Sequence, residues 1–147
     1  MLLIGVKNTT PQSVLVGGTV NLGSSYRKYC KKNSCGVTAF SRTANDITLQ
    51  HSGIYHVTAT LVASAPAAGV VTVQLYENGE PIVGAIASES ITTPTTELRT
   101  LILDYYIKVD KDCVLGVESV DAKAISLVNT GVAATFSNVV VNVTKEV

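Results

Sequence analysis

The chain has 147 residues and a formal net charge of zero, with eleven Lys and Arg residues against eleven Asp and Glu residues. This length fits one domain that can bury its own core, and a neutral chain lacks the positive field that collects nucleic-acid phosphates or anionic lipid. No window has eighteen unbroken apolar residues, which excludes a transmembrane helix. We therefore expect one domain without nucleic-acid or membrane partners.

The composition favours an all-β fold. Val, Ile and Thr supply about a third of the residues, and β-branched side chains suit a pleated sheet better than a helix. Only 15% of the residues are charged, which is less than a monomer surface usually carries. We expect part of the apolar surface to lie between subunits.

The first residues contain a short apolar run. Met1 to Ile4 are apolar, but Gly5 and Lys7 interrupt the run well before the length of a secretory leader. We expect no secretory leader. We predict that residues 1–13 form an N-terminal arm that could dock on another protein, and that residues 14–147 form the folded head.

A short strand and a basic loop are predicted next. Residues 14–22 read as a strand kinked at Gly17-Gly18, and the polar stretch 24–34 reads as a loop. The loop contains four cations, which could contact an acidic partner or a glycan: Arg27, Lys28, Lys31 and Lys32. Such a run is more often a solvated loop, and we favour that reading.

The chain has three cysteines, Cys30, Cys35 and Cys113. The spacer between Cys30 and Cys35 could close a small disulfide loop or leave two free thiols. A structural zinc site needs four ligands, and no second Cys or His pair follows at finger spacing. We therefore expect no metal here.

After short apolar stretches at residues 37–41 and 47–49, residues 55–63 predict the clearest strand of the first half. Apolar residues alternate along it with polar ones, at the period of two that places them on one face: Tyr55, Val57, Ala59, Leu61 and Ala63. His56 lies on the other face, and His51 precedes the turn at Ser52-Gly53. We expect the two histidines to be structural, because they face opposite sides and no nucleophile motif accompanies them.

The second half contains two predicted hairpins. Asn78-Gly79 between two apolar runs is a strong hairpin signal, because a type I′ turn needs positive φ at both central positions. A polar loop at 88–97 leads into a long strand at 98–109. One face of that strand carries Leu101, Leu103, Tyr105, Ile107 and Val109.

A second hairpin is expected to turn at Asp110 to Asp112 and return through residues 113–120. These carboxylates, with Asp104, could serve as acid and base or hold calcium, but the turn lacks the Gly and the downstream Glu of a calcium loop. Strands at 124–129 and from Ala134 complete the domain. Strands at this spacing, with no helical window, indicate a sandwich or a jelly roll.

Four segments together resemble the C1q and tumour-necrosis-factor-like jelly rolls: ITLQHSGIYHVTATL, VTVQLYENGEPI, VDKDCVLGVES and LVNTGVAATFSNVVVNV. The chain is most similar to the microbial branch, which includes heads of collagen-like spore-surface glycoproteins and phage virion proteins. The resemblance spans residues 14–145. The chain itself carries no Gly-X-Y stalk, and the basic loop with Cys30 and Cys35 is not a feature of the family.

The resemblance implies a ten-stranded jelly roll that assembles as a homotrimer with an apolar and aromatic seam along the threefold axis. Some C1q-like trimers also bind calcium near the apex. We expect five residues to be trimer-interface or core anchors: Tyr55, Val57, Tyr105, Ile107 and Phe136.

These observations lead to two functional hypotheses. The first is a non-enzymatic virion protein, a trimeric head on the surface of a bacteriophage particle that serves as a capsid decoration, head fibre or tail-associated component. It would dock on a capsid or other virion protein through the arm and could attach to a host receptor or glycan. The second is a spore-coat or bacterial cell-surface head that binds a host ligand or carbohydrate.

An enzyme on a jelly-roll scaffold is the third reading. A cupin needs a His-rich metal motif, and the chain has two histidines. We therefore expect no catalytic residues and no cofactor.

Overall fold

The computed structural model describes residues 2–29, 32, 38–110 and 121–146, and within them the chain is all-β, with no helix. No helix that could cross a membrane occurs in these ranges. The described residues form eleven strands: β1 (Leu2–Asn8), β2 (Gln12–Val14), β3 (Ser24–Lys28), β4 (Phe40–Arg42), β5 (Ile47–Leu49), β6 (Gly53–Ser64), β7 (Gly69–Glu77), β8 (Glu80–Ile91), β9 (Arg99–Val109), β10 (Lys123–Asn129) and β11 (Ala134–Lys145).

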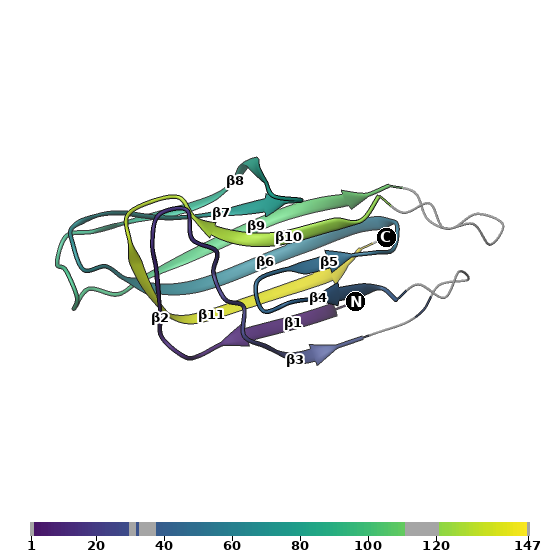
Figure 1. The fold of residues 1–147 in the computed structure, drawn as a ribbon, viewed down its shortest axis with the longest axis horizontal. Helices are drawn as coiled ribbons and strands as arrows, with labels where there is room; N and C mark the ends of the chain where they lie inside the picture. The colour runs from purple at the N-terminus through teal and green to yellow at the C-terminus, as the bar shows by residue number, and fades with distance from the viewer. Residues whose placement is uncertain (1, 30–31, 33–37, 111–120, 147) are drawn as a thin grey trace.

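The strands form two antiparallel sheets that face each other (Figure 1). Sheet A has the order β3-β1-β11-β6-β9, with β2 also paired to β11, and sheet B has the order β4-β5-β10-β7-β8. One edge of the sandwich therefore carries β3 and β4, and the opposite edge carries β8 and β9, which lie beside each other.

The predicted face of β6 is confirmed. Tyr55, Val57, Ala59, Leu61 and Ala63 are fully buried, because every second side chain of a strand points to the same face. β6 pairs with β11 on one side and with β9 on the other over almost its whole length. The core is thus built around β6 and its two neighbours in sheet A.

The Asn78-Gly79 hairpin is also confirmed. Asn78 has φ 52° and Gly79 has φ 79°, as a two-residue turn between β7 and β8 requires.

A bulge interrupts β8 farther along the strand. Residues 82–85 lie opposite Leu75 alone, because Gln74 pairs with Ile86 and Tyr76 with Pro81. This bulge places Val83 91% exposed on the edge of sheet B.

The structure differs from the prediction that residues 1–13 form an N-terminal arm. Leu2–Asn8 forms β1, an interior strand between β11 and β3, and Leu3, Ile4 and Val6 are core residues. These side chains are already covered within one chain, so they do not form a free docking segment. The pairing of Leu2 with Thr144 also brings the start of β1 and the end of β11 to the same end of the sandwich.

Three other boundaries differ from the prediction. Residues 14–22 form no continuous strand, since β2 ends at Val14 and the chain then turns at Gly17, which has φ 83°. The stretch predicted as a basic loop begins with β3, which pairs with β1. The stretch predicted as a loop at 88–97 begins inside β8, which continues to Ile91.

Some predictions fall outside the described residues. The cysteines Cys30, Cys35 and Cys113 lie there, and so does Lys31. The hairpin expected to turn at Asp110 to Asp112 also falls mostly outside them.

A substitution at the centre of the core tests this packing. Phe136→Ala should lower the free energy of unfolding by about 3–5 kcal/mol, because Phe136 is fully buried and truncation leaves a cavity. Val83→Ala should change it by less than about 0.5 kcal/mol, since Val83 is exposed. Equal effects of the two substitutions in urea denaturation would contradict the assigned core.

Candidate functional site

The outer surface of β6 and β9 is the most prominent exposed apolar feature of sheet A. We call the outward residues Ile54, His56, Ile102, Asp104 and Tyr106 the β6–β9 face. Ile102 is 70% exposed and Tyr106 is 58% exposed, although both lie in the middle of a long strand. Large apolar side chains at such positions suggest that another surface covers them.

Aromatic stacking and a hydrogen bond to Asp104 fix His56 on this face. His56 and Tyr106 are cross-strand partners, and their rings stack with centroids 4.4 Å apart and planes 8° apart. The His56 Nε2 atom lies 2.5 Å from the Asp104 carboxylate, and the Nδ1 atom lies 3.8 Å from Glu146. The imidazole is therefore held between two carboxylates and a ring.

His51 lies apart from His56. It is buried in the turn before β6, and its backbone carbonyl accepts a hydrogen bond of 2.6 Å from the Tyr55 hydroxyl. Within the described ranges, no group of three or more His, Cys, Asp or Glu side chains could hold a metal ion. The two histidines therefore take separate positions, as their spacing predicts.

The five residues predicted as anchors lie in or against the core of one chain. Tyr55, Val57, Ile107 and Phe136 are buried, and Tyr105 packs against the same core while remaining half-buried. Side chains that are covered in this way have little area left for a second subunit.

Sequence reasoning missed the exposed residues of the β6–β9 face. The alternation that placed Tyr55 and Leu101 inside also places Ile54, Ile102 and Tyr106 outside. Apolar residues at outward positions of an alternating strand were the signal that could have identified them.

The basic cluster is exposed, as expected, but part of it lies on a strand. Arg27 and Lys28 are exposed on β3, and Lys32 is exposed farther along the chain. β3 is one of the two edge strands of sheet A, so its outer side pairs with no other described strand.

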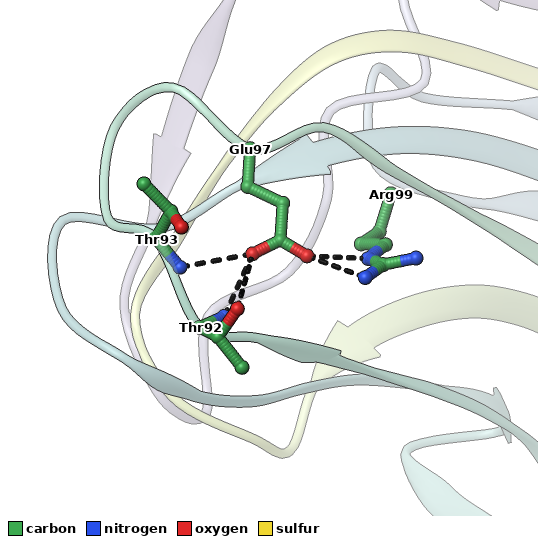
Figure 2. A network of polar contacts seen from close by, with 4 residues as sticks. All are labelled: Thr92, Thr93, Glu97 and Arg99. Carbon is green, nitrogen blue, oxygen red and sulfur yellow. Dashed lines mark hydrogen bonds and ion pairs between the residues drawn. The ribbon is translucent and has the colours of Figure 1, made fainter.

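Glu97 organises the connection between β8 and β9 (Figure 2). Its Oε1 atom accepts hydrogen bonds from the Thr92 and Thr93 backbone N–H groups at 2.8 and 2.9 Å and from the Thr92 hydroxyl at 3.0 Å. Its Oε2 atom accepts from Arg99 at 2.6 Å. The backbone donors, Thr93 first, together with Arg99 hold the pKa of Glu97 at about 2.

Among the described residues, Lys123 also has a clearly shifted pKa. The Glu77 carboxylate, 3.1 Å away, raises the pKa of Lys123, and Asp121 at 3.3 Å adds to the effect. Glu97 and Lys123 each bind neighbouring residues of the same chain, and these contacts explain why the pKa of each is shifted.

Comparison with known proteins identifies the fold. No family model matches the chain, and no curated protein matches it. The structure is similar to Eiger TNF from S. frugiperda, with a TM-score of 0.64 and 9% identity over 100% of this chain and 94% of that one. It is also similar to murine APRIL, with a TM-score of 0.52 and 8% identity over 95% and 97% of the two chains.

A third solved structure, the PRD1 vertex protein, has a TM-score of 0.48 and 19% identity over 97% of this chain and 93% of that one. The likeness to Eiger and APRIL shows that the chain has a TNF-like jelly-roll fold. Identities this low establish the fold alone.

The Glu97 contacts predict a pH-dependent contribution to stability. Because the pKa of Glu97 falls from 4.5 to about 2 on folding, its contribution is complete above pH 4.5 and is lost as pH falls towards about 2. Glu97→Gln should therefore lower the unfolding temperature at neutral pH, and the gap to the unmodified protein should narrow through this acid range. Thermal unfolding followed by circular dichroism at a series of pH values measures the gap.

Glu89→Gln is the matched control, since Glu89 is exposed on β8 and forms no ion pair with another described residue. It should lower the unfolding temperature much less at neutral pH. A Glu97→Gln gap that persists undiminished near pH 2 would show that the carboxylate charge is not responsible.

Proposed function

We propose that the protein is a non-enzymatic structural component of a bacteriophage particle, a homotrimeric jelly-roll head on the virion surface. The exposed apolar β6–β9 face on a TNF-like jelly roll is the observation that carries the proposal. The resemblance of the sequence to the microbial branch of this superfamily supports the phage setting.

The β6–β9 face alone is too small for a stable contact. β9 has eleven residues, which span about 36 Å, and two neighbouring strands are about 10 Å wide, so the face offers about 400 Å². A specific interface buries about 800 Å² on each partner. A further surface must therefore contribute.

The edge formed by β8 and β9 can supply that surface. Val83 is 91% exposed, Ile86 50% and Leu98 62%, and all three lie on β8 or just before β9. If this edge of one copy covers the β6–β9 face of the next, the two contacting surfaces differ. A contact of this kind closes into a ring when the rotation between copies allows it, and three copies form the smallest closed ring beyond a pair.

The charges on the β6–β9 face are compatible with burial. The Asp104 carboxylate is hydrogen-bonded to the His56 ring, and Lys108 pairs with Asp110 at 3.1 Å. Covering groups that are paired within one chain costs less than covering isolated charges. Burial of the exposed apolar area then favours association, by about 25 cal/mol for each Å² removed from water.

A single substitution on this face should prevent assembly. Light scattering after size exclusion should give the unmodified protein a mass of about three times 15.4 kDa. Ile102→Asp should yield a monomer, because a carboxylate would be buried without a partner. Val70→Asp is the matched control on the outer face of sheet B, where Val70 is 47% exposed, and should leave the trimer intact.

Monomers of the unmodified protein, both in solution and on the particle, would contradict the trimer.

The proposed origin in a bacteriophage particle is tested separately by the neighbouring genes. Genes for a major capsid protein, portal and terminase are the expected result, whereas a spore-coat operon would favour the spore-surface alternative.

A further inference from the structure

The net charge of zero conceals a separation of charge along the chain. Residues 1–45 contain six of the eleven Lys and Arg residues and no Asp or Glu. Four of these cations, Lys7, Arg27, Lys28 and Arg42, lie on β1, β3 and β4, at one edge of the sandwich. The turn after β4 contains Asp46, which accepts a hydrogen bond from the Thr43 N–H group. The four cations still leave this edge with a net positive charge.

The cations of this edge are not neutralised by other described residues. The ion pairs within the described ranges involve Arg99, Lys108, Lys123 and His56, all beyond residue 45. Arg42 instead donates to the Gly23 carbonyl at 2.6 Å and so ties β4 to the segment before β3. Clustered like charges repel one another, and a negatively charged ligand would relieve that repulsion.

An aromatic ring lies on the outer face of the same edge. Tyr26 is the extra residue of a bulge in β3, because Gly5 pairs with Arg27 and Val6 with Ser25. Its ring covers Gly5 so closely that a Cβ atom there would lie 2.5 Å from the Tyr26 Cζ atom. The Tyr26 hydroxyl donates to the Asn142 side chain, which fixes the ring flat on the sheet.

The remaining surface of the ring is accessible. Tyr26 is 46% exposed, and the Lys7 ammonium group lies over its ring, 5.8 Å from the centroid. A ligand that rests on the ring must share this face with the Lys7 ammonium group, and it therefore contacts both.

We call the Tyr26 ring with the Lys7 ammonium group the Tyr26 platform. A shallow polar cavity adjoins this platform. It has a volume of about 450 Å³ and is lined by Lys7, Asn8, Thr9, Thr10, Asn21, Gly23 and Ser24. Its walls are held by side chains that bond the backbone: the Gln12 amide both accepts from the Asn21 N–H group and donates to the Asn21 carbonyl, each at 2.8 Å. Lys7 belongs to both the cavity and the platform, so the two form one continuous site.

We propose that this edge binds an acidic glycan, a chain of sugars that carry carboxylates. One sugar ring stacks on Tyr26 through its apolar C–H face, and its carboxylate pairs with Lys7 in a charge-assisted hydrogen bond. The amides and hydroxyls of the cavity suit the hydroxyl groups of the next sugar. A nucleic acid would match the positive charge but would not need a cavity lined by these groups.

The site lies on one chain and does not require the proposed trimer. β3 and β9 are the opposite edges of sheet A, with three strands between them, so the assembly surface leaves Tyr26 uncovered. Glycan binding and assembly can therefore be measured separately, and either can fail without the other.

Calorimetric titration of the full chain with a hexamer of galacturonic acid tests the proposal, with the uncharged galactose hexamer as the matched ligand. The acidic hexamer should bind and the neutral one should bind at least about tenfold more weakly, since a hydrogen bond to a charged group contributes about 1.5–3 kcal/mol. Added salt should weaken the binding of the acidic hexamer.

Variants assign the binding to the described groups. Lys7→Gln and Tyr26→Ala should each weaken binding at least about fivefold, whereas Tyr26→Phe should retain most of it because the ring remains. Lys28→Gln is the matched control: Lys28 pairs with the buried Ile4 and so lies on the other face of β3. It should change binding by less than about twofold.

Thermal unfolding of each variant verifies that it is folded. If Tyr26→Ala does not fold, Lys7→Gln still tests the proposal. The proposal is overturned if the galacturonic acid hexamer does not bind, or if Lys28→Gln weakens binding as much as Lys7→Gln. It is also overturned if a single-stranded oligodeoxynucleotide of equal charge binds more tightly than the acidic hexamer, because the surface would then be a nucleic-acid site.

Discussion

The pairing of β6 with β11 and β9 is the constraint on which the rest of the structure depends. With a partner on each side, five residues of β6 have no exposure at all, from Tyr55 to Ala63. Since a slip of one residue would move all of them to solvent, the register is strongly fixed. The same register determines what lies outside, so the stacked His56 and Tyr106 rings and the exposed Ile102 follow from the pairing that builds the core.

The two edges of the sandwich differ in chemical character for a related reason. The edge strands β3 and β8 each pair with another described strand on one side only, and a bulge interrupts the pairing of both. The bulge in β8 exposes Val83, whereas the bulge in β3 brings Tyr26 over Gly5. Bulges of this kind redirect side chains and discourage uncontrolled strand pairing. One edge thus offers apolar surface and the other offers positive charge beside an aromatic ring.

The sequence was sufficient to predict the elements whose signal is local. The alternation of β6 and β9 and the Asn78-Gly79 turn each depend on neighbouring residues, and the structure confirms them. β1 was misread, because its pairing partner β11 is distant in sequence and a short apolar run has no period of its own. β3 could not be recognised, since all five of its residues are exposed and only its pairing with β1 makes it a strand. The Tyr26 platform was missed for the same reason, because Gly5, Tyr26 and Asn142 come together only in the folded sheet.

The pairing of Leu2 with Thr144 has a practical meaning for protein engineering. Because the two ends of the described chain are neighbours in one sheet, a short linker could join them, and the chain could be reopened in the turn at 65–68 at the opposite pole. Such a circular permutant would keep every strand pair of sheet A while reversing the direction from which a fused cargo projects. The domain could then be mounted with either pole facing outwards.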